Sequence, residues 1–221
     1  MAIAYQSTAW NSNAPFNSTS LSWSHTTSWS DRLLIVSTYF EWTSTTIGVT
    51  YSGVAMSLIS SIGNHYLYSL VAPATGANNV VITIGASRSL CGSSISFTWA
   101  NQSSPVDTFW TNSGTIPVSS TQNTGLTLTT ASANTIRVDS IAWQNGYYGT
   151  AWSGQTIRQF NSTTNDNVYD STLAVAWIGS STVNWSVTTG PGSSCTWNTV
   201  WAALKEVTAT PSTNSNFLSF M

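Results

Sequence analysis

Short runs of β-branched and aromatic residues, each closed by Gly, Asn, Ser or Pro, recur along nearly the whole chain of 221 residues. Residues 32–40 form a mostly apolar run, and in residues 94–99 apolar and polar side chains alternate. Such runs are typical of β-strands, whose successive side chains point to opposite faces. Good helix formers are scarce, so the sequence does not favour a helical bundle.

Ten to twelve strands are predicted from these runs. Residues 46–51 and 54–58 read as a hairpin around Ser52-Gly53. The other predicted strands are 65–71, 79–84, 125–130, 136–143, 171–178, 183–189 and 196–206. A short helix over residues 199–206 is the alternative to the last of these, and a strand is favoured. The spacing predicts an all-β fold, namely a jelly-roll-like antiparallel β-sandwich with extended N- and C-terminal arms.

One sandwich domain is expected over residues 20–206, since no internal repeat is convincing and no charged or Pro-rich linker divides the chain. The polar stretch 103–123 is predicted to be a long connection over one end. Residues 1–19 and 207–221 are predicted to be arms. The C-terminal arm ends in apolar side chains that are candidates for docking on this subunit or a neighbour, with a frayed terminus as the alternative: Phe217, Leu218, Phe220 and Met221.

Charged residues are rare. They make up 5% of the chain, against about 25% in an average soluble domain. The net charge of -2 comes without any cluster of Lys and Arg, which argues against nucleic-acid binding. The surface must therefore consist largely of hydroxyls and amides, because Ser and Thr form about a third of the chain. Such a surface suits a protein packed among partners or one that faces sugars.

The N-terminal residues lack the basic stretch and apolar run of a secretory signal peptide. No apolar stretch approaches the roughly 18 residues of a spanning helix, so no membrane partner is expected. Met1 suggests a chain made in a cytoplasm, or one that has lost its leader. Two buried thiols at Cys91 and Cys195 are favoured over a disulfide between them.

Candidate catalytic groups are few, and an enzyme is not expected. His25 and His65 are the only imidazoles, no Gly-x-Ser-x-Gly elbow or phosphate-binding loop occurs, and Ser is too common for a Ser-His-Asp set to be informative. The spacing of the seven carboxylates does not identify a pair of the kind that glycosidases use. A glycoside hydrolase or lyase is therefore only the third hypothesis. No cofactor and no metal are expected, with a calcium site at Asp166 and Asp170 as the alternative.

Aromatic residues are the main positive signal, and 12 of them are Trp. Exposed Trp and Tyr rings can stack on sugar rings while neighbouring amides bind hydroxyls. The densest cluster of this kind is predicted to be a loop, and its glycan-contact candidates are Asn145, Tyr147, Tyr148 and Trp152. The alternative for each ring is packing in the core or at a subunit contact.

Several stretches of the chain resemble a β-sandwich domain family that occurs in tailed-phage particle proteins and uncharacterised bacterial surface proteins. These stretches are Asp31–Val36, Val49–Met56, Leu67–Gly76, Asn79–Thr83, Ser96–Asp107, Ser153–Thr156 and Asn184–Ser186. The resemblance covers roughly residues 20–206 and rests on turns and core strands. It implies a particle-surface or adhesive role and no catalytic residues.

The leading hypothesis is a non-enzymatic structural protein of a phage virion, such as a head decoration, head-fibre or tail-associated subunit. It would be made in the host cytoplasm and would act as a homo-oligomer among other virion proteins, with adhesive contact to host-surface polysaccharide as an additional role. The alternative is a carbohydrate-binding module of a secreted or cell-surface protein.

Overall fold

The structure is a computed structural model that describes residues 2–14, 16–41, 47–124, 126–144, 149–151, 154–163, 166–175, 179–189, 192 and 194–207. Within these residues the chain forms nineteen β-strands and no helix, which confirms the predicted all-β sandwich architecture. In the same part of the chain no helix has the length and apolarity to cross a membrane.

The first half of the chain forms two antiparallel sheets that pack face to face. The first inner sheet has the order β1-β9-β3-β7-β6, with bounds β1 Ala4–Ser12, β9 Leu90–Thr98, β3 Leu33–Phe40, β7 His65–Val71 and β6 Ser57–Ile62. The first outer sheet has the order β2-β8-β4-β5, with bounds β2 Ser18–Thr27, β8 Gly76–Arg88, β4 Ile47–Tyr51 and β5 Val54–Ala55. β3 is buried along its whole length, because it is central in its sheet and covered on both faces.

The second half repeats this plan. The second inner sheet has the order β10-β19-β13-β16-β15, with bounds β10 Val106–Ile116, β19 Cys195–Leu204, β13 Thr135–Gln144, β16 Asp166–Val175 and β15 Thr156–Ser162. The second outer layer consists of two small sheets. One is β11-β18-β14 and the other β12-β17, with bounds β11 Thr121–Asn123, β18 Trp185–Thr188, β14 Gly149–Ala151, β12 Leu126–Thr130 and β17 Gly179–Val183.

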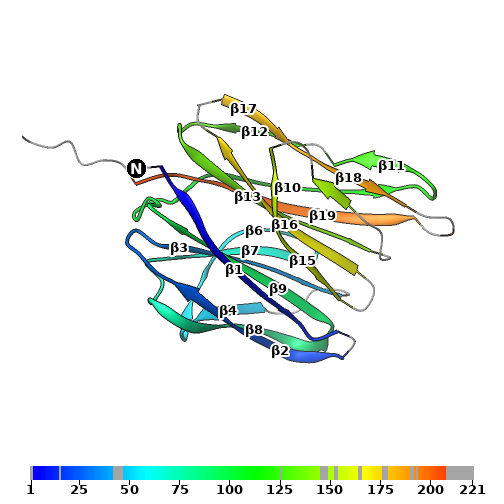
Figure 1. Cartoon of the computed structure of the whole chain (residues 1–221). Coiled ribbons are helices and arrows are strands. Elements are labelled where there is room, and N and C mark those ends of the chain that lie inside the picture. The colour runs from blue at the N-terminus through cyan, green and yellow to red at the C-terminus, as the bar shows by residue number, and fades with distance from the viewer. Residues whose placement is uncertain are drawn as a thin grey trace, which may run out of the picture.

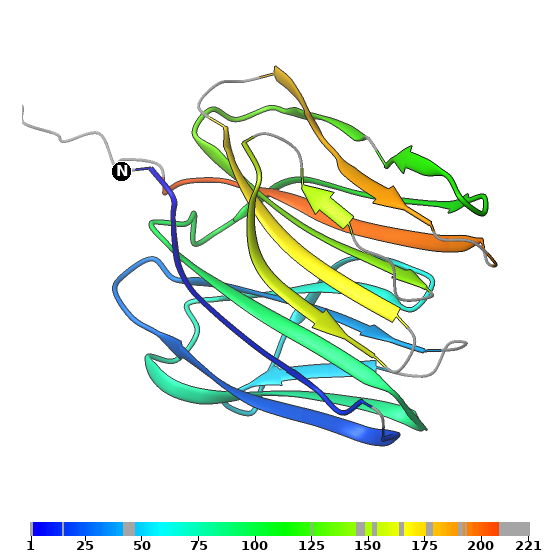
Figure 2. The same cartoon turned by 45° about the vertical axis from the view of Figure 1, so that its right-hand side comes forward.

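Figures 1 and 2 show the resulting four layers in the order first outer sheet, first inner sheet, second inner sheet, second outer layer. The two inner sheets have the same strand order when each half is counted from its first strand and the successive strands β5 and β6, β11 and β12, and β17 and β18 are each counted as one. Their β-bulges also match, at Gln6 and Asp107 in the first strand and at Ile59 and Arg158 in the opposite edge strand. The halves share topology without recognisable residue identity, which is why the sequence predicts no repeat.

Apolar side chains fill each of the three spaces between layers. The space between the two inner sheets holds a cluster that draws on both halves, for example Leu33, Ile35 and Phe97 from the first and Val138 and Leu204 from the second. A cluster around Trp23 and Phe40 fills the first sandwich, and one around Trp143 and Trp185 fills the second. The inner sheets are therefore buried on both faces, and the two halves share a core.

Most predicted strands are confirmed within a few residues at their ends. Residues 196–206 form strand β19 and not a helix. The β4–β5 hairpin turns at Ser52-Gly53, where both residues have positive φ, as a two-residue hairpin turn requires. Cys91 and Cys195 are buried thiols in two different core clusters, as expected.

Two predicted segments differ from the structure. Residues 4–12 are expected as part of an arm, yet they form β1, which pairs with β9 as an edge strand of the first inner sheet. The polar stretch 103–123 is expected as a connection, yet it contains β10 and β11. Both errors have the same cause, because an edge strand needs few apolar residues and its polar side chains look like a loop.

Candidate assembly edges and groove

The edge strands of the two inner sheets lie next to each other in pairs, one pair at each end of the molecule. β6 lies beside β10 at one end, and β1 lies beside β15 at the other. Among the described residues each of these four strands has one strand partner in its sheet, so its other edge is open. An open edge presents unpaired backbone N–H and C=O groups that can pair with another strand.

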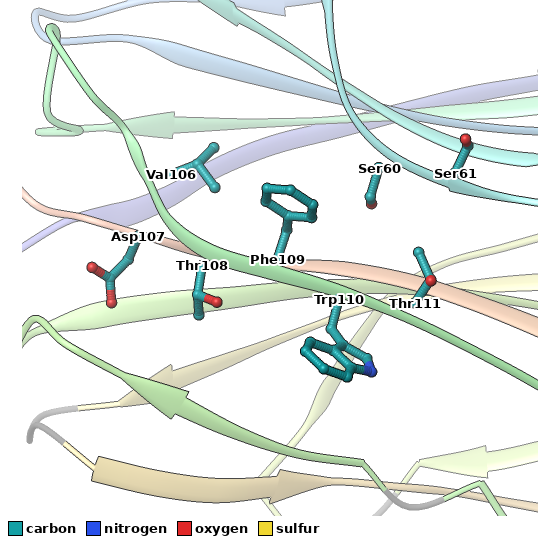
Figure 3. Close-up of a pocket in the computed structure, with 8 residues that line it drawn as sticks. All are labelled: Ser60, Ser61, Val106, Asp107, Thr108, Phe109, Trp110 and Thr111. Atoms are coloured by element: carbon teal, nitrogen blue, oxygen red, sulfur yellow. The ribbon is translucent and has the colours of Figure 1, made fainter.

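A groove of about 800 Å³ lies along the β6–β10 end. It is lined by Ser60 and Ser61 of β6 and by residues 106–111 of β10 (Figure 3). Phe109 and Trp110 are 52% and 56% exposed, and their side chains project to opposite sides of β10, as consecutive strand residues must. Two large rings are thus held at the surface of an open strand.

The polar groups of the groove are partly fixed by the fold. Asp107 is the bulge residue of β10, and its carboxylate accepts hydrogen bonds from the backbone N–H groups of Ala131 and Ser132, at 2.8 and 3.2 Å. It therefore ties β10 to the turn before β13. The buried Oγ of Ser60 has no hydrogen-bond partner among the described residues. A buried hydroxyl of this kind gains from any ligand that can pair with it.

The opposite end carries a similar set of apolar side chains. Trp10 of β1 is 52% exposed, and Ile157 and Phe160 of β15 are each 45% exposed. Arg158 places its guanidinium 3.8 Å from the centre of the Tyr5 ring, a cation–π contact that joins β15 to β1 across the two halves. Each end of the molecule therefore combines open strand edges with exposed rings.

A polar cluster lies between the central strands of the inner sheets and contains Ser, His and Asp. Ser140 Oγ lies 2.8 Å from His65 Nε2 and 2.7 Å from Ser37 Oγ. Ser93 Oγ donates to Asp170 Oδ2 at 2.5 Å. Burial lowers the pKa of His65 to about 4 and raises the pKa of Asp170, so both groups are biased toward their neutral forms.

This cluster lacks the order of a catalytic triad. The Nδ1–H of His65 donates to the carbonyl oxygen of Asn198 at 3.3 Å, where a triad would place the carboxylate, and Asp170 bonds to serine hydroxyls instead. His65, Ser140 and Asp170 are at most 1% exposed. The arrangement fixes the two sheets against each other, and a substrate has no path to it in this structure.

The glycan-contact candidates Asn145, Tyr147, Tyr148 and Trp152 lie outside the described residues. So do the docking candidates Phe217, Leu218, Phe220 and Met221. Both sets remain predictions.

The sequence prediction does not place Phe109 and Trp110 on a strand or in a groove, because their segment is taken as a loop. The run Thr108-Phe109-Trp110-Thr111, made of β-branched and aromatic residues, is the signal that could have placed them on a strand.

The calcium alternative gains no support from the described residues. Asp170 faces the interior cluster, and no group of three or more His, Cys, Asp or Glu side chains in the described part of the chain could hold a metal ion. Comparison of the chain with protein-family models, with curated proteins and with solved structures finds no match.

Proposed function

We propose that the protein is a non-enzymatic structural component of a phage particle, which assembles with copies of itself and with other virion proteins through its open sheet edges. The observation that carries the proposal is the pair of ends at which, as far as the described residues go, both edge strands are open. Proteins that stay monomeric usually protect such edges with Lys, Pro, bulges or a covering segment. Here each of the four edge strands carries one β-bulge, but the strands contain no Lys or Pro and only two charged residues, Asp107 and Arg158, and each end exposes large apolar side chains.

Strand addition explains how these ends could join copies. An edge strand of one copy can pair with an edge strand of another, so that backbone hydrogen bonds supply affinity while side chains such as Phe109 fill complementary sites. Because each copy has two such ends, contacts made at both would extend an assembly in one direction or close it into a ring. Low net charge leaves little electrostatic repulsion against such packing.

The strand order supports this proposal. In the first half the strands β1-β9-β3-β7 face β2-β8-β4-β5, an arrangement of eight strands that agrees with a jelly-roll fold. Jelly rolls are common in viral capsid and lectin domains. Together with the resemblance of residues 20–206 to a domain of tailed-phage particle proteins, this favours a virion location over the alternative of a secreted carbohydrate-binding module. Fold supports function only by analogy, so the edges carry the argument.

A charge reversal of the groove surface tests the proposal. The double variant Phe109→Lys and Trp110→Lys is expected to weaken self-association at least about tenfold, because two unpaired ammonium groups would have to be desolvated in the contact. Sedimentation velocity over a concentration series measures the effect. Phe16→Lys is the matched control, since Phe16 is 76% exposed in the β1–β2 connection and does not line the β6–β10 groove.

Two results would contradict the proposal. One is a wild-type protein that stays monomeric at every concentration and does not join particles when mixed with them. The other is equal association of the double variant, the control and the wild type, with all three sharing the same circular dichroism spectrum.

A further inference from the structure

A second pocket, of about 300 Å³, lies at the start of β1, away from the β6–β10 groove. It is lined by Ala4, Tyr5 and Gln6 of β1, Trp29 of the β2–β3 loop, Thr98 at the end of β9, and Trp99. Its volume is at the lower end of the range of about 300–1,000 Å³ for small-molecule sites. No charged side chain lines it.

Three aromatic rings surround this pocket. Trp29 is 74% exposed, while Trp99 and Tyr5 are half-buried. The Tyr5 ring is held in place by the Arg158 guanidinium over its face and by a 3.0 Å hydrogen bond between its hydroxyl and Thr8 Oγ1. Trp29 is buried little by this fold, and it lines the pocket together with Trp99 and Tyr5, so the three rings form an aromatic patch rather than a single exposed side chain.

The backbone that carries the two indoles is constrained. Trp29 and Trp99 have φ values of 70° and 56°, in the left-handed region that residues with a side chain rarely adopt. Arg32 donates to the carbonyl oxygen of Trp29, and the N–H of Val207 donates to that of Trp99 at 2.7 Å. The fold thus maintains an unfavourable conformation at two neighbouring tryptophans, as is common where a ligand is bound.

Gln6 supplies a polar group that the fold leaves unsatisfied. It is the bulge residue of β1, and its Nε2 donates to the carbonyl oxygen of Ser28 at 3.1 Å. Its Oε1 is buried and has no hydrogen-bond partner among the described residues. The matching bulge residue of the second half, Asp107, uses its carboxylate to bind the turn before β13. Gln6 binds the corresponding loop, between β2 and β3, with its side-chain nitrogen, and its side-chain oxygen is left unpaired.

We infer that this pocket binds a neutral sugar ring through the faces of Trp29 and Trp99, next to Tyr5, with Gln6 Oε1 accepting a hydrogen bond from a ring hydroxyl. The C–H face of a pyranose is apolar and slightly electropositive, which matches the electron-rich face of an indole. A sugar hydroxyl can donate to the unpaired Gln6 Oε1, and it brings no charge into a pocket that no charged side chain lines. The site would add adhesive contact with glycans to a subunit whose edges serve assembly.

Titration of the full chain with neutral methyl glycosides tests the inference. Methyl glucoside, methyl mannoside, methyl galactoside and methyl N-acetylglucosaminide are added up to high millimolar concentration. Tryptophan fluorescence and saturation-transfer NMR report binding. At least one glycoside is expected to bind, and both Trp29→Ala and Gln6→Met are expected to weaken it about tenfold or more. Trp10→Ala is the matched control, because Trp10 is an exposed indole on β1, the strand that also carries Gln6, but does not line the pocket.

Failure of every glycoside to bind the wild type would overturn the inference. So would binding that Trp29→Ala leaves unchanged, or that Trp10→Ala reduces equally. Because Trp29 lies in the β2–β3 loop, outside the four edge strands and the β6–β10 groove, Trp29→Ala should leave sedimentation unchanged, which separates this test from that of assembly.

Discussion

Lowering the pH from 7 to 4 is expected to reduce the free energy of unfolding by several kcal/mol. Burial lowers the pKa of His25 and of His65 from 6.5 to about 4. Below pH 6.5 the unfolded chain takes up protons that the folded chain excludes, so stability present above pH 6.5 is lost as the pH falls toward 4. A difference of about 2.5 pKa units corresponds to roughly 3 kcal/mol for each histidine.

Burial keeps the two histidines neutral in the folded chain, and the hydrogen bond from His65 to the carbonyl oxygen of Asn198 offsets only part of this effect by raising the pKa. His25 lies between Ser94 Oγ, at 2.7 Å from its Nδ1, and Ser7 Oγ, at 3.1 Å from its Nε2. His65 lies between a serine hydroxyl and a backbone carbonyl. The raised pKa of Asp170 acts in the opposite direction, because its protonated form is favoured in the folded chain and its contribution is lost as the pH rises.

Urea unfolding at a series of pH values measures this dependence. The variant His65→Gln is expected to be less stable at pH 7 and to lose about half of the pH dependence that comes from the histidines, since His25 is then the only histidine. A wild-type stability that stays constant between pH 7 and 4.5 would contradict the prediction.

Replacing Trp185 by Ala is expected to destabilise the second sandwich by about 3–5 kcal/mol, enough to unfold a marginal domain. The ring is 2% exposed and packs against Trp143, with ring centroids 6.4 Å apart. Its Nε1–H also donates to Asp139 Oδ2 at 2.5 Å. The substitution therefore leaves a large cavity and removes a donor from a buried carboxylate.

The same change at an exposed tryptophan is the control. Trp110→Ala is expected to alter the unfolding free energy by less than about 0.5 kcal/mol. Trp185→Phe separates the two contributions, because it keeps most of the ring and loses only the N–H donor. Equal denaturation midpoints for Trp185→Ala and Trp110→Ala would show that the second core does not depend on this ring.

The sequence predicts the central strands well because each has a strong apolar pattern. The predicted strand 32–40 contains all eight residues of β3, each of them buried, and the predicted strand 65–71 coincides with β7. β1, β10 and β15 are missed as strands, since strands at the edge of a sheet bury little and their Ser, Thr and Asn residues resemble a loop.

The candidate site was less predictable than the fold. The predicted aromatic cluster at 145–152 lies mostly outside the described residues, whereas Trp110 and Trp29 become notable only once their exposure is known. Composition shows that 12 tryptophans are present but not which of them face solvent. The role of Gln6 depends on a bulge and an unpaired oxygen, and no local sequence pattern specifies either.

The pairing of first with last strand in each half has a consequence for synthesis. β1 can pair only after β9 has been synthesised, and β10 only after β19. Each sandwich therefore closes only after about ninety further residues have been made. The first sandwich can complete itself while the second is still on the ribosome. Until the second inner sheet has been made, Leu33, Ile35 and Phe97 of the first inner sheet face water. This nascent intermediate is the state in which the chain most needs a chaperone.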